Sequence, residues 1–202
     1  MPAETDSAST IDEALSNWRQ GDCVLGEAWF VYRTTTSSAD EVGLRETAVA
    51  GLVIVTQTCD VVRTSAVRPF IEISPLVELT QDDFDMAARG RRPQYGVVPA
   101  LAEKRLVADL DRTMTVEKSV VATWERVVGC RSDGESRAFA NALARKRKRF
   151  AFPDDFNGLA HKLRARIQDK HDKQTDDGRA LRDLREIRVQ ASPAWNAQAV
   201  DL

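Results

Sequence analysis

The apolar positions of the chain fall in short runs, and the most compact run is Leu52-Val53-Ile54-Val55. Four consecutive apolar residues, mostly β-branched, predict a strand buried on both faces, because a half-buried strand would alternate apolar and polar positions. The polar segment 56–60 follows without a linker. Functional side chains often lie where a rigid strand gives way to a polar turn. The segment 51–63 is therefore the predicted centre of the fold and the first candidate for a site.

Shorter patterns on both sides of this run predict more strands. Residues 23–32 carry a strand pattern, with Gly26 at a position typical of a bulge. Residues 70–74 alternate apolar and polar side chains, and Pro75 should end that strand because proline cannot donate to a ladder. Further strands are predicted over 95–99 and 106–110, and loops over 34–44 and 60–67.

Helices are predicted near both ends of the chain. A polar tail over residues 1–10 should lead into a short helix that Thr10 caps and that ends near Trp18. Beyond Gly129 the composition shifts to good helix formers. Further helices are predicted over 79–88, 116–128, 135–148 and from 154 onward. A last strand is predicted over 184–189.

These elements together predict an α+β protein that is mainly β, with a helical addition after the strands. Several short strands separated by turns favour a small barrel or sandwich. The predicted organisation is a flexible tail and short helix over 1–16, the barrel over 17–130, and a helical extension with a returning strand over 131–202.

Four segments, taken in order, resemble the MazF/PemK toxin family. They are WRQGD at 18–22, GLVIVTQTCD at 51–60, FIEISPLVEL at 70–79 and LVADLDRTMTVEKSV at 106–120. The resemblance covers roughly residues 17–128. It implies an SH3-like β-barrel with short helices, usually dimeric. It also implies a sequence-selective, metal-independent endoribonuclease of a bacterial toxin–antitoxin or phage-defence system.

The chain departs from the family at the position of a catalytic arginine. The family carries an Arg-Pro pair before its apolar strand, whereas residues 47–51 here read TAVAG, and Arg45 is nearby but out of register. The family's catalytic Ser or Thr maps onto Thr56 or Thr58. The missing arginine favours the alternative, a catalytically silent barrel that acts as a protein-interaction or regulatory module.

RNA cleavage of this type needs an activated 2′-OH and groups that stabilise the charge on the phosphate. Thr56 or Thr58 would contact the phosphate, and Arg63, Arg45 or Arg91 would supply positive charge. The structural alternative is a strand end whose threonine side chains satisfy the amides of a turn. The predicted catalytic residues are Thr56, Thr58, Arg63 and Arg45.

The densest basic run of the chain is 145–149, and Phe150 and Phe152 follow it. Such a run is usually a solvated helix face, but it could also hold a phosphate backbone, with the aromatic rings stacking on bases. The segment 131–188 has 16 basic and 10 acidic side chains, although the whole chain carries a net charge of -2. The predicted nucleic-acid contacts are Gln57, Arg91, Arg92, Arg145, Lys146, Arg147, Lys148 and Arg149.

Composition narrows the class of protein. The 43% apolar content is ordinary for a globular chain, no apolar run nears the ~20 residues of a membrane span, and a secretory signal is not expected. The cysteines Cys23, Cys59 and Cys130 have no metal-type spacing, which fits a reducing cytoplasm. We therefore expect a cytoplasmic protein with no cofactor, no metal and no membrane contact. The expected partners are RNA, a protein antitoxin or regulator, and a second copy in a homodimer.

A cysteine nucleophile is a third, weaker hypothesis. Cys59 would need a base to form the thiolate, and the two histidines of the chain, His161 and His171, both lie in the charged C-terminal half. We expect Cys59 to be buried where it packs the end of the strand, and both histidines to be solvated. The pair Asp109 and Asp111 is weak evidence for a Mg²⁺ site, and capping or pairing to Arg105 or Arg112 is the favoured explanation.

Overall fold

A computed structural model of the chain describes residues 3–35, 42–148 and 154–184, together with residues 187, 189, 190 and 192. The chain divides into two compact units, Met1–Lys148 and Arg149–Leu202. The first unit holds all the strands of the described chain: β1 (Cys23–Thr35), β2 (Val42–Ile54), β3 (Phe70–Glu78), β4 (Tyr95–Val97), β5 (Leu106–Asp109) and β6 (Met114–Glu117). Its helices are α1 (Ala3–Leu15), α2 (Thr58–Val61), α3 (Gln81–Ala88), a 3₁₀ helix over Pro99–Lys104, α4 (Lys118–Val121) and α5 (Asp133–Arg147). The second unit contains α6 (Asp154–Lys170) and α7 (Asp176–Asp183).

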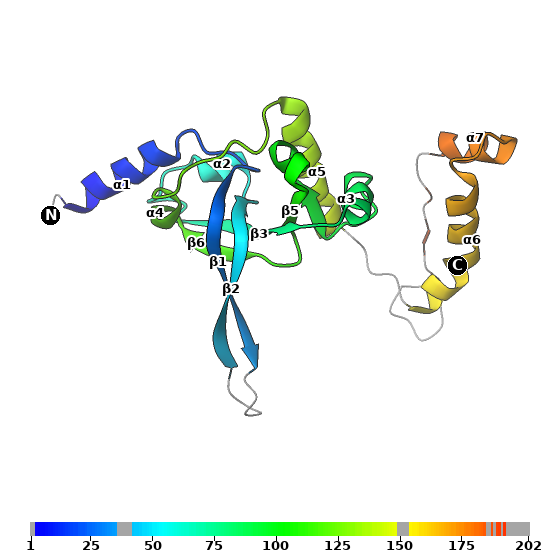
Figure 1. The fold of residues 1–202 in the computed structure, drawn as a ribbon, viewed down its shortest axis with the longest axis horizontal. Helices are drawn as coiled ribbons and strands as arrows, with labels where there is room; N and C mark the ends of the chain where they lie inside the picture. The colour runs from blue at the N-terminus through cyan, green and yellow to red at the C-terminus, as the bar shows by residue number, and fades with distance from the viewer. Residues whose placement is uncertain are drawn as a thin grey trace. The chain divides into compact units, whose positions relative to one another are not determined.

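The six strands form one antiparallel sheet, so the predicted α+β class is confirmed. The strand order is β1-β2-β3-β5-β4, and β6 pairs with β3. Within the described residues the sheet is not closed, and the expected SH3-like barrel is therefore not seen. Among the described strands, β1 and β4 lie at the two ends of the order and are not paired with each other. The outer parts of β1 and β2 run as a two-stranded ribbon away from the other strands (Figure 1).

The prediction that Pro75 ends its strand is wrong. Strand β3 runs through Pro75 to Glu78, and Pro75 lies opposite Leu52 of β2. Beyond that position β3 pairs with β5, beginning at Leu76 opposite Ala108. The missing N–H of the proline thus falls where the strand exchanges one neighbour for another, which is a place that tolerates the loss of a ladder donor.

The apolar run 52–55, which ends β2 and extends one residue beyond it, is buried on both faces, as its sequence predicted. Leu52, Val53, Ile54 and Val55 are each at most 3% exposed. Leu52 and Ile54 pack in one apolar cluster with Trp18, Phe30, Ile71 and Ile73. Val53 and Val55 pack in a second cluster with Leu76, Leu110, Phe139 and Leu143. Alternation along the strand therefore joins two separate cores.

Helix α5 covers the second cluster and belongs to the first unit (Figure 1). Ser132 caps it in a capping box with Glu135, which satisfies amides at the start of the helix. Phe139 and Leu143 are buried on the helix face that meets the sheet. The helix predicted over 135–148 is thus confirmed, and its packing places its basic end beside the end of β2.

Several other boundaries differ from prediction. The tail expected over 1–10 is helical from Ala3. The loop expected over 34–44 is strand up to Thr35 and again from Val42. The helix expected over 116–128 is instead the end of β6, the short α4 and turns. Helix α3 confirms the helix predicted over 79–88, and Thr80 caps it. Of the strand predicted over 184–189, residues 185, 186 and 188 lie outside the described residues, and Leu184 is the C-cap of α7.

A candidate nucleic-acid site at the end of strand β2

Two of the sequence segments singled out above dock onto each other at the end of β2. The backbone N–H of Gln20 donates to Thr58 Oγ1 over 3.1 Å, and its side-chain Nε2 donates to the carbonyl of Val55 over 2.8 Å. The next residue, Gly21, has φ of 94° and donates its N–H to the carbonyl of Ile54. A left-handed backbone of this kind favours glycine. The turn at Gln20 therefore fixes the polar segment that follows the strand.

The buried side chain of Asp22 holds this turn in place. Its side chain is only 1% exposed and accepts from the backbone N–H of Arg19 at 2.8 Å, from Arg126 Nε at 2.7 Å and from the N–H of Gly129 at 3.2 Å. A buried carboxylate that is fully hydrogen bonded and paired with an arginine is stable in place. Asp22 is therefore a structural residue of the site.

Lys118 holds the other side of the segment 56–63, a role that the sequence did not indicate. It is 1% exposed, and its Nζ donates to the carbonyl of Asp60 over 3.0 Å and to the carbonyl of Arg63. Burial lowers the pKa of Lys118, while the nearby carboxylates of Asp12 and Asp60 act in the opposite direction. The bonds fix the turn after α2. A lone lysine within the segment 106–120 was the only sequence signal.

The threonine hydroxyls at the strand end bind backbone groups. Thr56 Oγ1 accepts from the N–H of Glu72 over 2.6 Å, and Thr58 Oγ1 accepts from Gln20. This is the role that the structural alternative assigns to them. Both threonines are nevertheless only half-buried, so that they are still partly accessible.

A hollow of about 610 Å³ opens beside this strand end and extends to helix α5. We call it the mouth hollow. Its lining residues come from the turn, the end of β2, the start of β3 and the last part of α5: Gln20, Val55, Thr56, Gln57, Asp60, Arg68, Phe70, Glu72, Ala140, Leu143, Ala144, Arg147 and Lys148. The structure thus brings together Thr56 and Gln57 with Arg147 and Lys148, which the sequence assigned to two separate regions.

The cations of the mouth hollow are accessible. Arg147 pairs with Glu72 of β3, and the two side chains are 60% and 45% exposed. Arg68 lies 3.9 Å from Asp60. Exposed ion pairs of this kind contribute roughly 0–1 kcal/mol, so a phosphate can replace the carboxylate at little cost. The guanidinium groups are therefore held in position and can still bind an anion.

Phe70, which was not among the predicted site residues, supplies an aromatic surface in the mouth hollow. Phe70 begins β3 opposite Glu117 of β6, and it is 55% exposed while lining the mouth hollow. Aromatic rings beside a cationic groove are the platforms on which unpaired bases stack. Alternation along 70–74 predicted a half-buried strand, but nothing in the sequence shows that the Phe70 ring lies beside the cations of α5.

The other predicted residues lie elsewhere. Thr58, Arg63 and Arg45 are not among the residues that line the mouth hollow. Arg63 is exposed in the turn after α2, and Arg45 is exposed on β2 opposite Tyr32. Arg91 lies in the turn after α3, and Arg149 lies outside the described residues.

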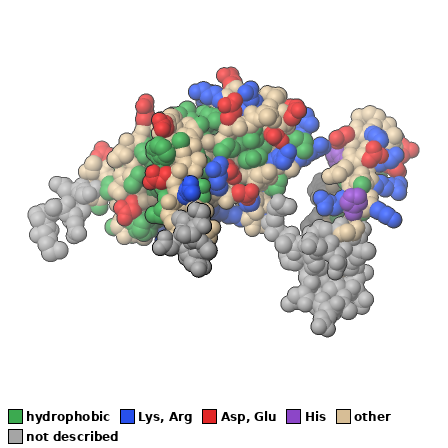
Figure 2. Space-filling view, turned by 60° about the horizontal axis from the view of Figure 1, so that its bottom comes forward, with side chains coloured by type: hydrophobic (Ala, Val, Ile, Leu, Met, Phe, Trp, Pro, Cys, Tyr) green, Lys and Arg blue, Asp and Glu red, His purple; other side chains and the backbone are tan. Residues whose placement is uncertain are grey.

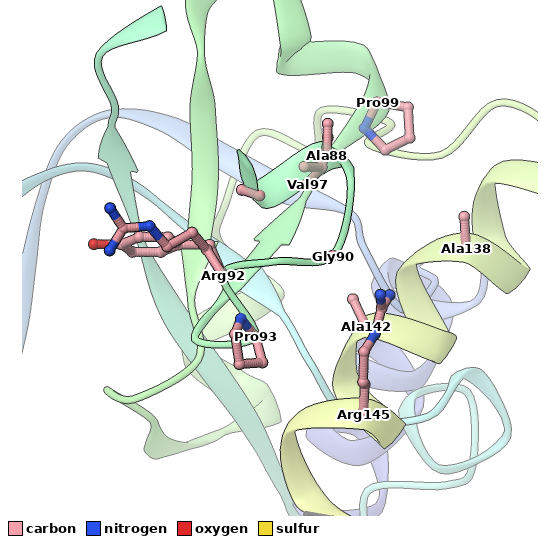
Figure 3. Close-up of a pocket in the computed structure, with 11 residues that line it drawn as sticks. Ala88, Gly90, Arg92, Pro93, Val97, Pro99, Ala138, Ala142 and Arg145 are labelled. Carbon is pink, nitrogen blue, oxygen red and sulfur yellow. The ribbon is translucent and has the colours of Figure 1, made fainter. Parts of the chain in front are cut away.

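A second, smaller pocket lies on the other side of α5, between that helix and the turn after α3. It measures about 210 Å³ and is lined mainly by small apolar residues, with Arg92 and Arg145 among them. Figure 3 shows Arg145 reaching from the helix toward Gly90, so closely that any side chain at residue 90 would collide with the guanidinium. Arg92 pairs with Asp83 over 2.6 Å. Arg145 and Arg92 therefore do not share a site with Arg147.

Cys59 is exposed, so the expectation of a buried cysteine at the strand end is wrong; Cys23 is the buried one. The Cys59 thiol lies 3.8 Å from Gln57 Oε1, on the four-residue helix α2. His161 lies on α6 and His171 follows that helix, both in the second unit, and both side chains are exposed. The part of the chain that the structure describes contains no group of three or more His, Cys, Asp or Glu side chains suited to a metal ion.

Comparison with known proteins adds nothing to this geometry. No family model, no curated protein and no solved structure matches the chain. Among the helices that the structure describes, none combines the length and the apolar character that crossing a membrane requires.

Proposed function

We propose that the protein is an RNA-binding effector that holds single-stranded RNA in the mouth hollow. The observation that carries the proposal is one exposed aromatic ring, Phe70, lining the same hollow as Arg68, Arg147 and Lys148. Cations supply sequence-independent affinity for phosphates, and a ring supplies stacking that any base can use. Gln57, which is exposed and lines the hollow, adds an amide group that can hydrogen bond to sugars or bases.

The resemblance to MazF/PemK toxins extends the proposal to cleavage in a toxin–antitoxin or phage-defence setting, on an SH3-like arrangement of the strands. Attack by the RNA's own 2′-OH requires no metal, only groups that position the phosphate and stabilise its charge. Thr56 and Arg147 both line the mouth hollow and are the residues best placed for that role. Thr58, Arg63 and Arg45 stay predictions.

A second candidate function is a protein-interaction module, and the β1–β2 ribbon favours it. Trp29, Val42 and Leu44 lie on one face of the ribbon by strand register and are 52%, 60% and 71% exposed. Val42 and Leu44 are adjacent on this face, and Trp29 lies farther along it, opposite Ala48. Exposed apolar side chains that recur on one face are typical of a surface that contacts another protein. An antitoxin or regulator bound there would be compatible with RNA in the mouth hollow.

The RNA proposal is tested by comparing two double variants of α5 that carry the same change in charge. Arg147→Ala with Lys148→Ala removes two cations from the mouth hollow, whereas Arg137→Ala with Arg145→Ala removes two exposed arginines of the same helix outside it. Binding of a fluorescent single-stranded RNA is measured by anisotropy over a range of salt. The first variant should flatten the slope of log affinity against log salt by about 1–1.4, since each phosphate that is no longer neutralised lowers the slope by about 0.7. The second should leave the slope near that of the wild type.

The same mixtures, incubated in EDTA, report cleavage. Metal-independent cutting should leave cyclic-phosphate ends and should slow in the Arg147→Ala protein. Equal slopes for the two double variants would show that the mouth hollow does not hold RNA. RNA that neither binds nor is cut, in EDTA or in Mg²⁺, would leave the interaction module as the function to pursue.

A further inference from the structure

A small chamber adjoins the mouth hollow beneath helix α5. It measures about 220 Å³ and shares Val55, Leu143 and Arg147 with the mouth hollow. Phe70, Glu72 and Ser74 fall on one face of β3, because alternate residues of a strand point the same way. The face runs from the ring at the rim to Ser74, which lines the chamber. We call this space the Ser74 chamber.

Ser74 is the unusual residue of the chamber. Its side chain is 0% exposed, and its Oγ is the one buried side-chain polar atom of the described residues that has no hydrogen-bond partner. A buried unpaired hydroxyl costs stability, and native proteins keep few of them. Ser74 also lines the chamber, so its hydroxyl is a candidate to hydrogen bond to something that enters the chamber.

The chemistry of the walls limits what can enter. Val55, Leu110 and Leu143 are apolar, and Thr113 supplies a second hydroxyl. The two cations that line the chamber are each paired: Lys146 with Asp111, and Arg147 with Glu72. Each cation thus has a carboxylate partner outside the chamber. Mainly apolar walls with two hydroxyls suit a flat ring that has polar edges.

We propose that the Ser74 chamber receives one unpaired base of the bound RNA, with the Ser74 and Thr113 hydroxyls hydrogen bonding to its polar edge. This inference rests on the proposed function. The volume would hold several waters at roughly 30 Å³ each, which is also room for a single heterocyclic ring. A base at Phe70 and the next base in the chamber would place the phosphate between them beside Arg147, which lines both spaces.

The two spaces have different roles in this arrangement. Stacking on Phe70 tolerates any base, because every base has a π-face. A hydrogen bond to the buried Ser74 hydroxyl discriminates, since a base that cannot make it leaves this hydroxyl unpaired. The mouth hollow therefore supplies affinity, and the Ser74 chamber supplies preference among bases.

The experiment measures the affinities of homopolymeric oligoribonucleotides of uridine, adenosine and cytidine, of equal length, by anisotropy. The wild type should bind one of them clearly more tightly than the others. Ser74→Ala and Thr113→Val should each reduce the ratio of best to worst affinity about three- to tenfold, the effect of losing one hydrogen bond. Thr115→Val makes the same isosteric change at an exposed position of β6 outside the chamber and should leave the ratio unchanged. Phe70→Ala should weaken all three alike.

Thermal melting separates recognition from structure. Because Ser74 Oγ has no partner, Ser74→Ala should melt at or above the temperature of the wild type. A large drop in melting temperature would show that the hydroxyl binds structural water, and would overturn the inference. Tight RNA binding with no preference among bases, or with a preference that survives both Ser74→Ala and Thr113→Val, would overturn this inference alone. Failure of every oligomer to bind would overturn the proposed function as well.

Discussion

Three polar side chains are buried within the described residues of the first unit, and each has a different environment. Asp22 accepts from three donors, and Lys118 donates to two carbonyl oxygens. Ser74 has no partner at all. The first two hold the ends of the segment that follows β2, and complete hydrogen bonding offsets the cost of their burial. The third is the exception that points to a ligand.

The cysteines give a residue-level prediction from pKa. Burial, with a further contribution from the Asp22 carboxylate, raises the pKa of Cys23 from 9.0 to about 12. Burial and the Glu135 carboxylate raise the pKa of Cys130 to about 11. The thiolate is the reactive form, so at pH 9 Cys23 should carry several hundredfold less of it than an ordinary thiol. Iodoacetamide should therefore label the exposed Cys59 first, as mass spectrometry of the intact protein and its peptides would report.

Unfolding supplies the control for this labelling. In urea all three cysteines should react at comparable rates. The raised pKa values of Cys23 and Cys130 also make the free energy of unfolding depend on pH. The contribution of the two protonated thiols is fully present below pH 9, and it is lost as the pH rises through about 11 to 12. Equal labelling of the three thiols in the native protein would contradict the burial described for Cys23.

Elements whose pattern is complete within their own sequence could be predicted, and elements that depend on distant partners could not. The prediction for β2 was confirmed because four consecutive apolar residues determine a buried strand locally. The prediction for α5 was confirmed because its helix formers and its apolar face lie within one short stretch. Strand β3 was cut short at Pro75, because nothing in the sequence shows that a strand changes neighbours there. The segment 116–128 was assigned to one helix since its valines recur at helical spacing. In the structure Val116 belongs to β6 and pairs with Ile71 of β3, so tertiary pairing overrides the spacing.

The dependence of the fold on β2 can be tested within that strand. Ile54→Asp places an unpaired carboxylate at a position with 0% exposure and also removes an apolar side chain from the cluster around Trp18. The lost packing costs about 2–5 kcal/mol and the buried charge several more, which together approach the whole stability of a domain. Circular dichroism should show no cooperative thermal transition. Ala48→Asp, an exposed position on the same strand, should retain one. A folded Ile54→Asp protein would remove β2 from the centre of the fold.

The distribution of charge over the molecule, and the distance in sequence between the site residues, are the reasons why the site could be predicted only in part. Lys and Arg side chains are interspersed with Asp and Glu on the face shown in Figure 2, so that no large field of one sign marks a nucleic-acid surface there. The mouth hollow instead joins Thr56, Phe70 and Arg147, which are far apart in the chain. Thr56 and Arg147 were chosen from local motifs. Phe70 and Ser74 could not be, because their importance depends on the position of α5 over β3.

Photo-crosslinking tests the location of bound RNA most directly. Single-stranded RNA that contains 4-thiouridine is bound to the full chain, irradiated and mapped by mass spectrometry. The crosslinks should fall on peptides that contain Phe70, the segment 55–57 and the end of α5, and they should be lost in the Arg147→Ala/Lys148→Ala protein but not in the Arg137→Ala/Arg145→Ala protein. Crosslinks confined to residues 154–184 or to the β1–β2 ribbon would contradict the assignment of RNA to the mouth hollow.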